Sequence, residues 1–247
     1  MSRTSRNNVT SSFSPITYTK LSVIVPVFNE RNTVVEILRR MRLVQLPEGL
    51  DLEVLIVDDG STDGTREVLR QLGDSTVRVV LQPTNMGKGA AVREGFAHVT
   101  GDLVLVQDAD LEYDPEDWPK LINPVIKGKA LVVYGSRFTG ERRNMLFLHW
   151  IGNRFLSLAT NVLYNTTLSD METCYKLMDR RVIERLTLRS NRFEIEPEVT
   201  AKILKLGVRI YEVPISYTGR EFDEGKKITW RDGFSALWTL IKYRFTD

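Results

Sequence analysis

Two aspartates one residue apart, Asp108 and Asp110, directly follow residues 103–107, an apolar run typical of a buried strand. Because such a strand ends at the edge of its sheet, both side chains should emerge there. Carboxylates at this spacing can hold a hard divalent ion, Mg²⁺ or Mn²⁺, which keeps coordination positions open for substrate phosphate oxygens. The alternative is a solvated turn, since aspartate is common in turns. The position after a strand, with further acids nearby, favours the metal site.

Three more carboxylates are expected at the same edge. Glu30 follows the first predicted strand, and Asp58 and Asp59 follow the second. Ligands of open α/β sheets bind beyond the carboxyl ends of the strands, where acids accept hydrogen bonds from ribose hydroxyls or from a base N–H. The segment after Asp59 also fits a helix cap formed by Thr62 or Asp63. Both interpretations can hold together.

Two basic segments are candidates for contact with phosphate. Lys88 lies in the Gly-rich segment 85–91 at the start of a predicted helix. Its spacing is not that of a P-loop, but a helix N-terminus that faces a phosphate is left open. Arg220, Lys226 and Lys227 lie in a polar loop near the C-terminus. This loop is either a solvated charge run or a lid that brings cations to a pyrophosphate leaving group.

The elements that must position these residues alternate along the first half of the chain. Apolar runs predict strands, and segments with helical periodicity separate them, so the pattern indicates an α/β layer with a mostly parallel sheet. The predicted strands are residues 22–27, 52–57, 77–81, 103–107, 130–134 and 208–214. The predicted helices are residues 34–41, 64–72, 87–97, 115–127, 150–164 and 196–206.

Three segments are expected along the chain: a disordered tail at residues 1–20, a catalytic domain at 21–229 and an amphipathic helix at 230–247. A single face of this C-terminal helix carries a row of apolar side chains: Trp230, Phe234, Leu237, Trp238 and Ile241. That face either lies in a membrane interface or packs on the core of the protein.

The composition excludes several classes of protein. The 247 residues include 34 Lys and Arg and 32 Asp and Glu, which gives a net charge of +2. This charge is too small for a nucleic-acid binder that depends on bulk charge. A single cysteine, Cys174, and two histidines exclude a disulfide framework and a Cys-based zinc site. No run of about 20 apolar residues is present. These features predict a cytoplasmic protein, with a peripheral membrane location left open.

The motifs together resemble the family-two inverting glycosyltransferases, which have the Rossmann-like GT-A nucleotide-sugar fold. Within the family, the chain is most similar to dolichyl- and polyprenyl-phosphate mannose or glucose synthases. The resemblance covers residues 21–227, and it predicts a mostly parallel central sheet flanked by helices with a C-terminal, acceptor-side helical region. The segments that carry it are residues 25–30, 57–65, 85–89, 107–112, 135–137 and 212–215.

The resemblance implies a role for each motif. A nucleotide sugar, UDP-glucose or GDP-mannose, is the expected donor, a lipid phosphate at the membrane surface the expected acceptor, and Mg²⁺ or Mn²⁺ the cofactor. The donor-binding residues are Pro26, Phe28, Glu30, Val57, Asp58, Asp59, Lys88, Asp108, Ala109, Glu112 and Lys226. The metal ligands are Asp108, Asp110 and Glu112, and the acceptor-binding residues are Arg137, His149 and Asn153. The catalytic residues are Asp110, Asp170 and Arg220.

Two departures bear on these roles. Phe28 stands where many members have tyrosine, and residues 149–153 stand where the lipid-phosphate synthases have an Arg-x-x-x-Ser element. A hydroxyl acceptor would require a general base, for which Asp170 is the candidate, with a helix cap as its alternative role. A sugar-1-phosphate nucleotidyltransferase and a non-catalytic binding module are the other classes considered. A homo-oligomer or a membrane-protein partner is left open.

Overall fold

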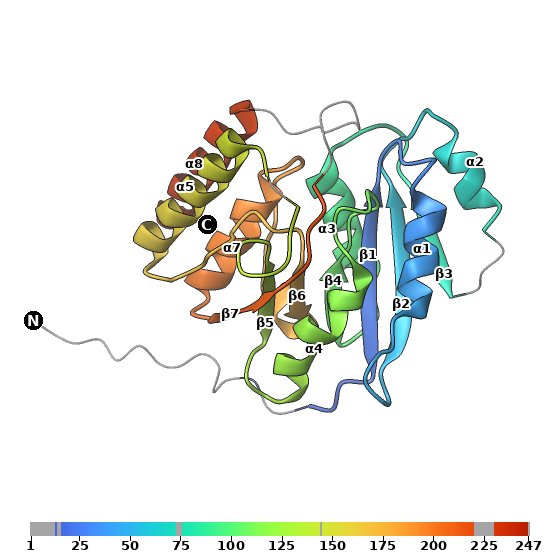
Figure 1. Ribbon diagram of the computed structural model, residues 1–247, viewed down its shortest axis with the longest axis horizontal. Helices are drawn as coiled ribbons and strands as arrows, with labels where there is room; N and C mark the ends of the chain where they lie inside the picture. The colour runs from blue at the N-terminus through green and yellow to red at the C-terminus, as the bar shows by residue number, and fades with distance from the viewer. Residues whose placement is uncertain (1–12, 14–15, 73–75, 144, 220–229, 247) are drawn as a thin grey trace, which may run out of the picture.

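The computed structural model describes residue 13 and residues 16–72, 76–143, 145–219 and 230–246 of the chain (Figure 1). For residues 230 and 231 only the backbone is described.

One central sheet holds the seven strands of the described residues, in the order β3-β2-β1-β4-β6-β5-β7. Every strand pair is parallel except those of β6, which runs antiparallel to both β4 and β5. The predicted α/β class with a mostly parallel sheet is therefore confirmed. The strands are β1 Lys20–Val27, β2 Asp51–Asp58, β3 Val77–Leu81, β4 Leu103–Val106, β5 Val132–Ser136, β6 Lys176–Asp179 and β7 Ile210–Pro214.

Helices pack on the sheet, and several of them gather at one end of the molecule. Figure 1 shows α5, α7 and α8 gathered at one end of the molecule and α1 and α2 at the other. The helices are α1 Val34–Leu43, α2 Thr65–Arg70, α3 Lys88–His98, α4 Trp118–Ile126, α5 Phe147–Tyr164, α6 Arg180–Ile183, α7 Ile195–Lys205 and α8 Trp230–Phe245. The helix expected at residues 115–127 begins as a 3₁₀ turn, Pro115–Asp117, before α4.

Strand β6 was not predicted from the sequence. All four of its residues are buried, yet two of them are charged, so the segment lacks both an apolar run and an alternating pattern. Because β6 runs against its neighbours, its first residue, Lys176, pairs with Tyr134 late in β5. The chain just before β6 therefore lies at the edge where β4 and β5 end.

The chain is already packed before the start of the predicted catalytic domain. The Tyr18 hydroxyl donates to Asp179 Oδ2 at 2.9 Å, and Thr19 donates its N–H and its hydroxyl to Asp102 Oδ2, each at 2.8 Å. These bonds connect the segment before β1 to residues beside β4 and β6.

The start of α3 is covered by the backbone of residues 190–192. Gly87 has φ +99°, and an added Cβ would lie 2.4 Å from the carbonyl oxygen of Asn191. A Cβ on Gly89 would lie 2.5 Å from the carbonyl oxygen of Ser190. The Ala90 N–H donates to the Asn191 carbonyl at 2.9 Å. The glycines therefore permit close packing within the protein, which argues against the alternative that this helix N-terminus faces a phosphate.

Helix α8 packs on the protein through one face and leaves most of the predicted apolar row exposed. Ala236, Leu240 and Tyr243 are buried, whereas Phe234 is 68% exposed and Trp238 is 65% exposed. Of the predicted row, Leu237 packs against the buried cluster shared with α5, whereas Phe234, Trp238 and Ile241 are exposed. In the described part of the chain, no helix combines the length and apolar character needed to cross a membrane.

Gly87→Ala should lower the free energy of unfolding by about 2–4 kcal/mol, because the new Cβ adds a backbone clash to a left-handed φ. Gly49→Ala is the matched control, since Gly49 has φ +80° with open space around it and should cost only about 1 kcal/mol. Urea unfolding curves of the two variants measure the difference. Equal losses would contradict the role given to the contact with Asn191.

Candidate active site

The acids singled out from the sequence lie at one edge of the sheet. Strands β1, β2 and β4 are parallel neighbours, so Glu30, Asp58 and Asp108 all follow carboxyl ends on that edge. Arg137 follows β5, which is antiparallel to β6 as β4 is, and therefore reaches the same edge. The predicted gathering of the acids at one edge is confirmed by the topology.

On the β2 side, two aspartates have different environments. Asp58 is fully buried, and its Oδ1 accepts from Arg66 Nε at 2.6 Å, while Oδ2 is buried with no hydrogen-bond partner among the described residues. Asp59 accepts from Met86 N at 2.7 Å and Gly87 N at 2.8 Å. Burial raises the pKa of Asp59 despite these two bonds. Asp59 thus holds the segment that begins α3.

The loops after β1 and β2 are tied to each other. Asn29 Oδ1 accepts from Thr62 N at 2.8 Å, and Glu30 Oε2 accepts from the Thr33 hydroxyl at 2.7 Å beside the start of α1. Asp63 Oδ1 accepts from Thr65 N at 3.0 Å, but the N-cap of α2 is Gly64, with φ +97° and no capping side chain, so the predicted N-cap at Thr62 or Asp63 is wrong.

Two predicted donor-binding side chains are closed off from the edge of the sheet. Val57 and Ala109 belong to the hydrophobic core, at 0% and 2% exposure, so neither side chain can line a nucleotide site. This corrects the prediction for their side chains. Pro26 and Phe28 are half-buried.

A chain of alternating charges runs inward from Asp108. Lys88 Nζ lies 2.9 Å from Asp108 Oδ1 and 3.3 Å from Glu196 Oε1, and Glu196 also pairs with Lys176. Burial alone would lower the pKa of Lys88, but the charges of Asp108 and Glu196 raise it well above its ordinary value. Lys88 is therefore a fixed cation next to the first aspartate of the predicted metal site.

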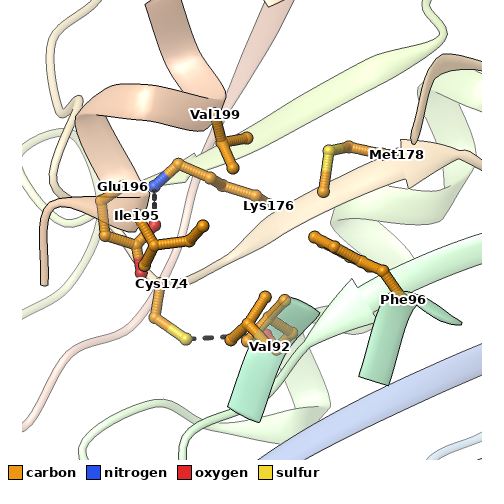
Figure 2. A pocket seen from close by; sticks show the side chains of 9 residues that line it. Val92, Phe96, Cys174, Lys176, Met178, Ile195, Glu196 and Val199 are labelled. Atoms are coloured by element: carbon orange, nitrogen blue, oxygen red, sulfur yellow. Dashed lines mark hydrogen bonds and ion pairs between the residues drawn. The ribbon is translucent and has the colours of Figure 1, made fainter. Parts of the chain in front are cut away.

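The interior end of this chain borders a small cavity beneath the edge of the sheet. Figure 2 shows the Lys176–Glu196 pair and, below Glu196, Cys174, with Phe96 and Met178 across from them. The remaining lining is apolar and includes Val92 and Phe96 of α3. Burial raises the pKa of the Cys174 thiol, so the thiol stays protonated.

The turn after Asp108 is strained. Leu111 has φ +64°, which is rare for a bulky residue and occurs mostly at functional sites. Asp110 Oδ1 accepts from Glu112 N at 3.1 Å, and Glu112 Oε2 accepts from the Tyr217 hydroxyl at 2.8 Å. The local hydrogen bonds therefore direct Glu112 towards Tyr217.

The predicted three-carboxylate metal set is not assembled. Over the described ranges, no group of three or more His, Cys, Asp or Glu side chains could hold a metal ion. Glu112 accepts instead from the Tyr217 hydroxyl. Asp108 and Asp110 still fit a divalent ion of the magnesium type, which takes one or two carboxylates and completes its shell with water and substrate phosphate oxygens.

Arg137 and Asp170 form a buried bidentate ion pair. Arg137 Nε lies 2.7 Å from Asp170 Oδ2, and Arg137 Nη2 lies 2.7 Å from Oδ1. The Arg137 N–H also donates to Oδ2, at 3.0 Å. Asp170 is fully buried, and its charge raises the pKa of Arg137 well above the ordinary value although burial opposes this. Asp170 is therefore a partner of Arg137, which corrects its predicted roles as general base or helix cap.

Neighbouring side chains position this pair. Glu212 accepts from Ser169 N at 2.9 Å and from Asp170 N at 3.2 Å, which holds the loop that carries Asp170. Asn153 of α5 accepts from Arg137 Nη2 at 3.3 Å and donates to the His149 carbonyl at 2.7 Å. The structure thus brings the three predicted acceptor residues together.

Tyr217 connects the two halves of the site and was not singled out from the sequence. Arg137 Cζ lies 5.3 Å from the centre of the Tyr217 ring, and the hydroxyl of the same ring binds Glu112. Glu196 was missed as well. Neither residue has a local signal, because each acts through partners distant in sequence. Arg220, Lys226 and Lys227 lie outside the described residues.

Known proteins share both the sequence pattern and the fold. Glycosyl transferase family 2 matches residues 22–187 of the chain. The chain belongs to glycosyl transferase family 2. The predicted family and the predicted enzyme class, a glycosyltransferase, are thereby confirmed at the level of the family.

Two curated relatives of this family 2 chain come from an archaeon and a bacterium. Glycosyltransferase AglJ of Haloferax volcanii is 33% identical over 80% of the chain. The undecaprenyl-phosphate 4-deoxy-4-formamido-L-arabinose transferase of Enterobacter sp. is 30% identical over 84% of it. The aligned regions span 63% and 62% of these longer relatives.

Among solved structures, the glucosyl-3-phosphoglycerate synthase of Mycobacterium tuberculosis is similar, with a TM-score of 0.70. The match is 22% identical and covers 93% of this chain and 81% of the synthase. That structure contains Mn²⁺, UDP and glucosyl-3-phosphoglycerate. The similarity confirms the GT-A fold predicted for this family 2 member.

Glu172 should make stability depend on pH. Its Oε1 is buried with no hydrogen-bond partner in the described part of the chain, and burial raises its pKa from 4.5 to about 7. A raised carboxyl pKa means that the folded state binds the extra proton, so stability is full below pH 4.5 and falls as pH rises towards 7.

Glu172→Gln removes this titration. Unfolding free energies measured from pH 4 to pH 8 should fall less steeply in the variant, by on the order of 1–3 kcal/mol over the window. Glu184→Gln is the control, because Glu184 is exposed whereas Glu172 is buried. Parallel curves for the wild type and Glu172→Gln would show that Glu172 does not titrate in this range.

Proposed function

We propose that this family 2 member transfers a hexose, with inversion at C1, from a nucleotide sugar to a polyprenyl-phosphate acceptor, with the help of a divalent cation. The names of the curated relatives support a lipid-phosphate acceptor, since one is an undecaprenyl-phosphate sugar transferase. The manganese and UDP in the similar synthase support a nucleotide donor with a metal. UDP-glucose and GDP-mannose are the leading donors.

The observation that carries the acceptor class is the Arg137–Asp170 pair. A hydroxyl acceptor needs a base to remove its proton, and the acid predicted for that task is fully engaged with a guanidinium. A phosphate monoester is already anionic near neutral pH and needs a cation to orient it. Arg137, fixed by Asp170 and Asn153, is such a cation.

On the donor side, Asp108 and Asp110 are the residues that would hold the cation. When bound, the metal neutralises charge that grows on the leaving nucleotide diphosphate. Lys88 balances the charge of Asp108 and places a second positive group beside it. Asp58, with its unpartnered buried Oδ2, and Phe28 lie on the side of the edge where the nucleoside would bind.

In the reaction, an oxygen of the acceptor phosphate forms a bond to C1 of the hexose. The bond between C1 and the nucleotide diphosphate oxygen breaks, and the electron pair leaves with the diphosphate. Arg137 orients the attacking phosphate, and Tyr217 sets the distance between Arg137 and the turn at Glu112. Arg220 and Lys226 remain the predicted cations of a lid over the diphosphate.

A panel of nucleotide sugars with and without Mn²⁺, followed by transfer assays, tests this function. Each sugar that binds is offered with a polyprenyl phosphate, with the corresponding polyprenol and with 3-phosphoglycerate. Sugar transfer to the phosphate alone supports the proposal. Transfer to a hydroxyl acceptor instead, or release of pyrophosphate from a sugar 1-phosphate and a nucleotide, would refute it.

Asp110→Asn should lower the turnover number by at least about 100-fold while the protein stays folded, because a half-exposed metal ligand is lost. Asp114→Asn is the control on the same loop: Asp114 Oδ1 accepts from Glu116 N at 3.0 Å, a bond that asparagine can keep. Steady-state assays with a thermal unfolding check compare the two. Full activity of Asp110→Asn, or of the wild type with excess chelator, would contradict the metal site.

Arg137→Lys should raise the KM for the acceptor phosphate by at least about tenfold, because lysine cannot form the bidentate pair that orients the cation. Donor affinity should change little, which titration with the nucleotide sugar measures. Arg154→Lys, on the exposed side of α5, is the matched control. An unchanged acceptor KM in Arg137→Lys would remove Arg137 from the acceptor site.

A further inference from the structure

One side of α5 carries a row of large apolar side chains that contact solvent. They recur at three- or four-residue intervals, so they form a single stripe along the helix. The helix is anchored by the opposite side, where Leu156, Ser157 and Thr160 are buried. Exposure reaches 71% at Phe147 and 75% at Val162, and the stripe also includes Ile151, Phe155 and Leu158.

Helix α8 packs against α5 and carries a second exposed apolar stripe. The Tyr164 hydroxyl at the end of α5 donates to the Leu240 carbonyl at 2.7 Å, and the two helices share a buried apolar cluster. Figure 1 shows both at the same end of the molecule. The outward side of α8 carries Phe234, Trp238, Ile241 and Phe245. We call the two stripes the α5–α8 apolar surface.

Basic side chains outnumber acidic ones around this surface, where Asp232 in the first turn of α8 is an acidic exception. Residues 142–169 contain three arginines and no aspartate or glutamate, and Lys242 and Arg244 lie at the end of α8. Arg142 and Arg154 both lie against the Phe138 ring, with Cζ 5.7 and 5.6 Å from its centre. A soluble monomer rarely leaves so many large apolar side chains together, and a cationic margin complements an anionic lipid surface.

The surface also borders the acceptor side of the site. Asn153, between Ile151 and Phe155 on α5, accepts from Arg137 Nη2. A lipid phosphate bound at Arg137 would therefore have its hydrocarbon chain within reach of the α5 stripe. A second copy of the chain is a poorer occupant, because a symmetric contact would bring the cationic margins of both copies together.

We propose that the α5–α8 apolar surface docks the protein onto an anionic lipid bilayer, with both helices lying in the plane of the interface. The inference rests on the proposed function: if the acceptor is a lipid phosphate, docking would place Arg137 at the depth of the lipid phosphate groups. Amphipathic helices bind this way through buried apolar area together with attraction to anionic lipids.

Co-sedimentation of the full chain with vesicles tests the docking. The wild type should sediment with phosphatidylcholine–phosphatidylglycerol vesicles and less with phosphatidylcholine alone. The double variants Phe155→Ser/Leu158→Ser and Phe234→Ser/Trp238→Ser should each lower the partition coefficient about tenfold or more, because two large apolar side chains are lost. The control is Val35→Ser/Leu43→Ser, two exposed apolar residues of α1, which should bind as the wild type does.

Two further measurements separate the outcomes. Thermal unfolding and nucleotide-sugar binding confirm that each variant is folded, and transfer to a water-soluble, short-chain isoprenyl phosphate should be unchanged in Phe234→Ser/Trp238→Ser, whose substitutions lie on α8. Vesicle binding without any transfer would refute the proposed function and leave the docking standing. Failure of the wild type to bind anionic vesicles, equal binding by all variants, or a dimer that the α5 and α8 substitutions dissociate would overturn the docking proposal.

Discussion

A charged pair removed from water constrains the acceptor half of this protein. Arg137 and Asp170 neutralise each other through two side-chain hydrogen bonds, and removing either partner would leave the other as a buried, uncompensated charge, typically at a cost of about 3–5 kcal/mol. The pair joins the end of β5 to the chain that leads into β6. Glu212 fixes the Asp170 backbone, and Asn153 brings α5 to the guanidinium. The pair thereby connects α5 to the end of β5.

Much of the fold could be predicted because its signals are local. Buried parallel strands such as β1 and β2 appear as apolar runs, and the helices between them have the expected periodicity. The topology rule for α/β sheets then places Glu30, Asp58 and Asp108 on one edge without knowledge of any contact. The acids were correctly placed at this edge because each lies at or just after the end of its strand.

The predictions that failed concern features that are set by contacts between residues distant in sequence. β6 has four residues and forms only because β4 and β5 leave a place between them. Asp170 could be assigned as a base because its spacing says nothing of Arg137, which lies 33 positions earlier. A phosphate-facing helix N-terminus was left open for the Gly-rich segment, and only the fold shows that the backbone of Asn191 takes the space at Gly87. Glu112 was grouped with the metal ligands because Tyr217 could not be seen beside it.

The antiparallel strand β6 also sets the distance between the ends of β4 and β5. Neighbouring strands lie about 4.8 Å apart, so placing β6 between β4 and β5 separates the ends of those two strands by about 10 Å. Asp108 and Asp110 follow one end, and Arg137 follows the other. If β4 and β5 were direct neighbours, the aspartates and the arginine would be close enough to pair with each other and leave no room for a sugar ring. A single inverted strand thus acts as a spacer, and the width of one polypeptide keeps two opposite charges apart.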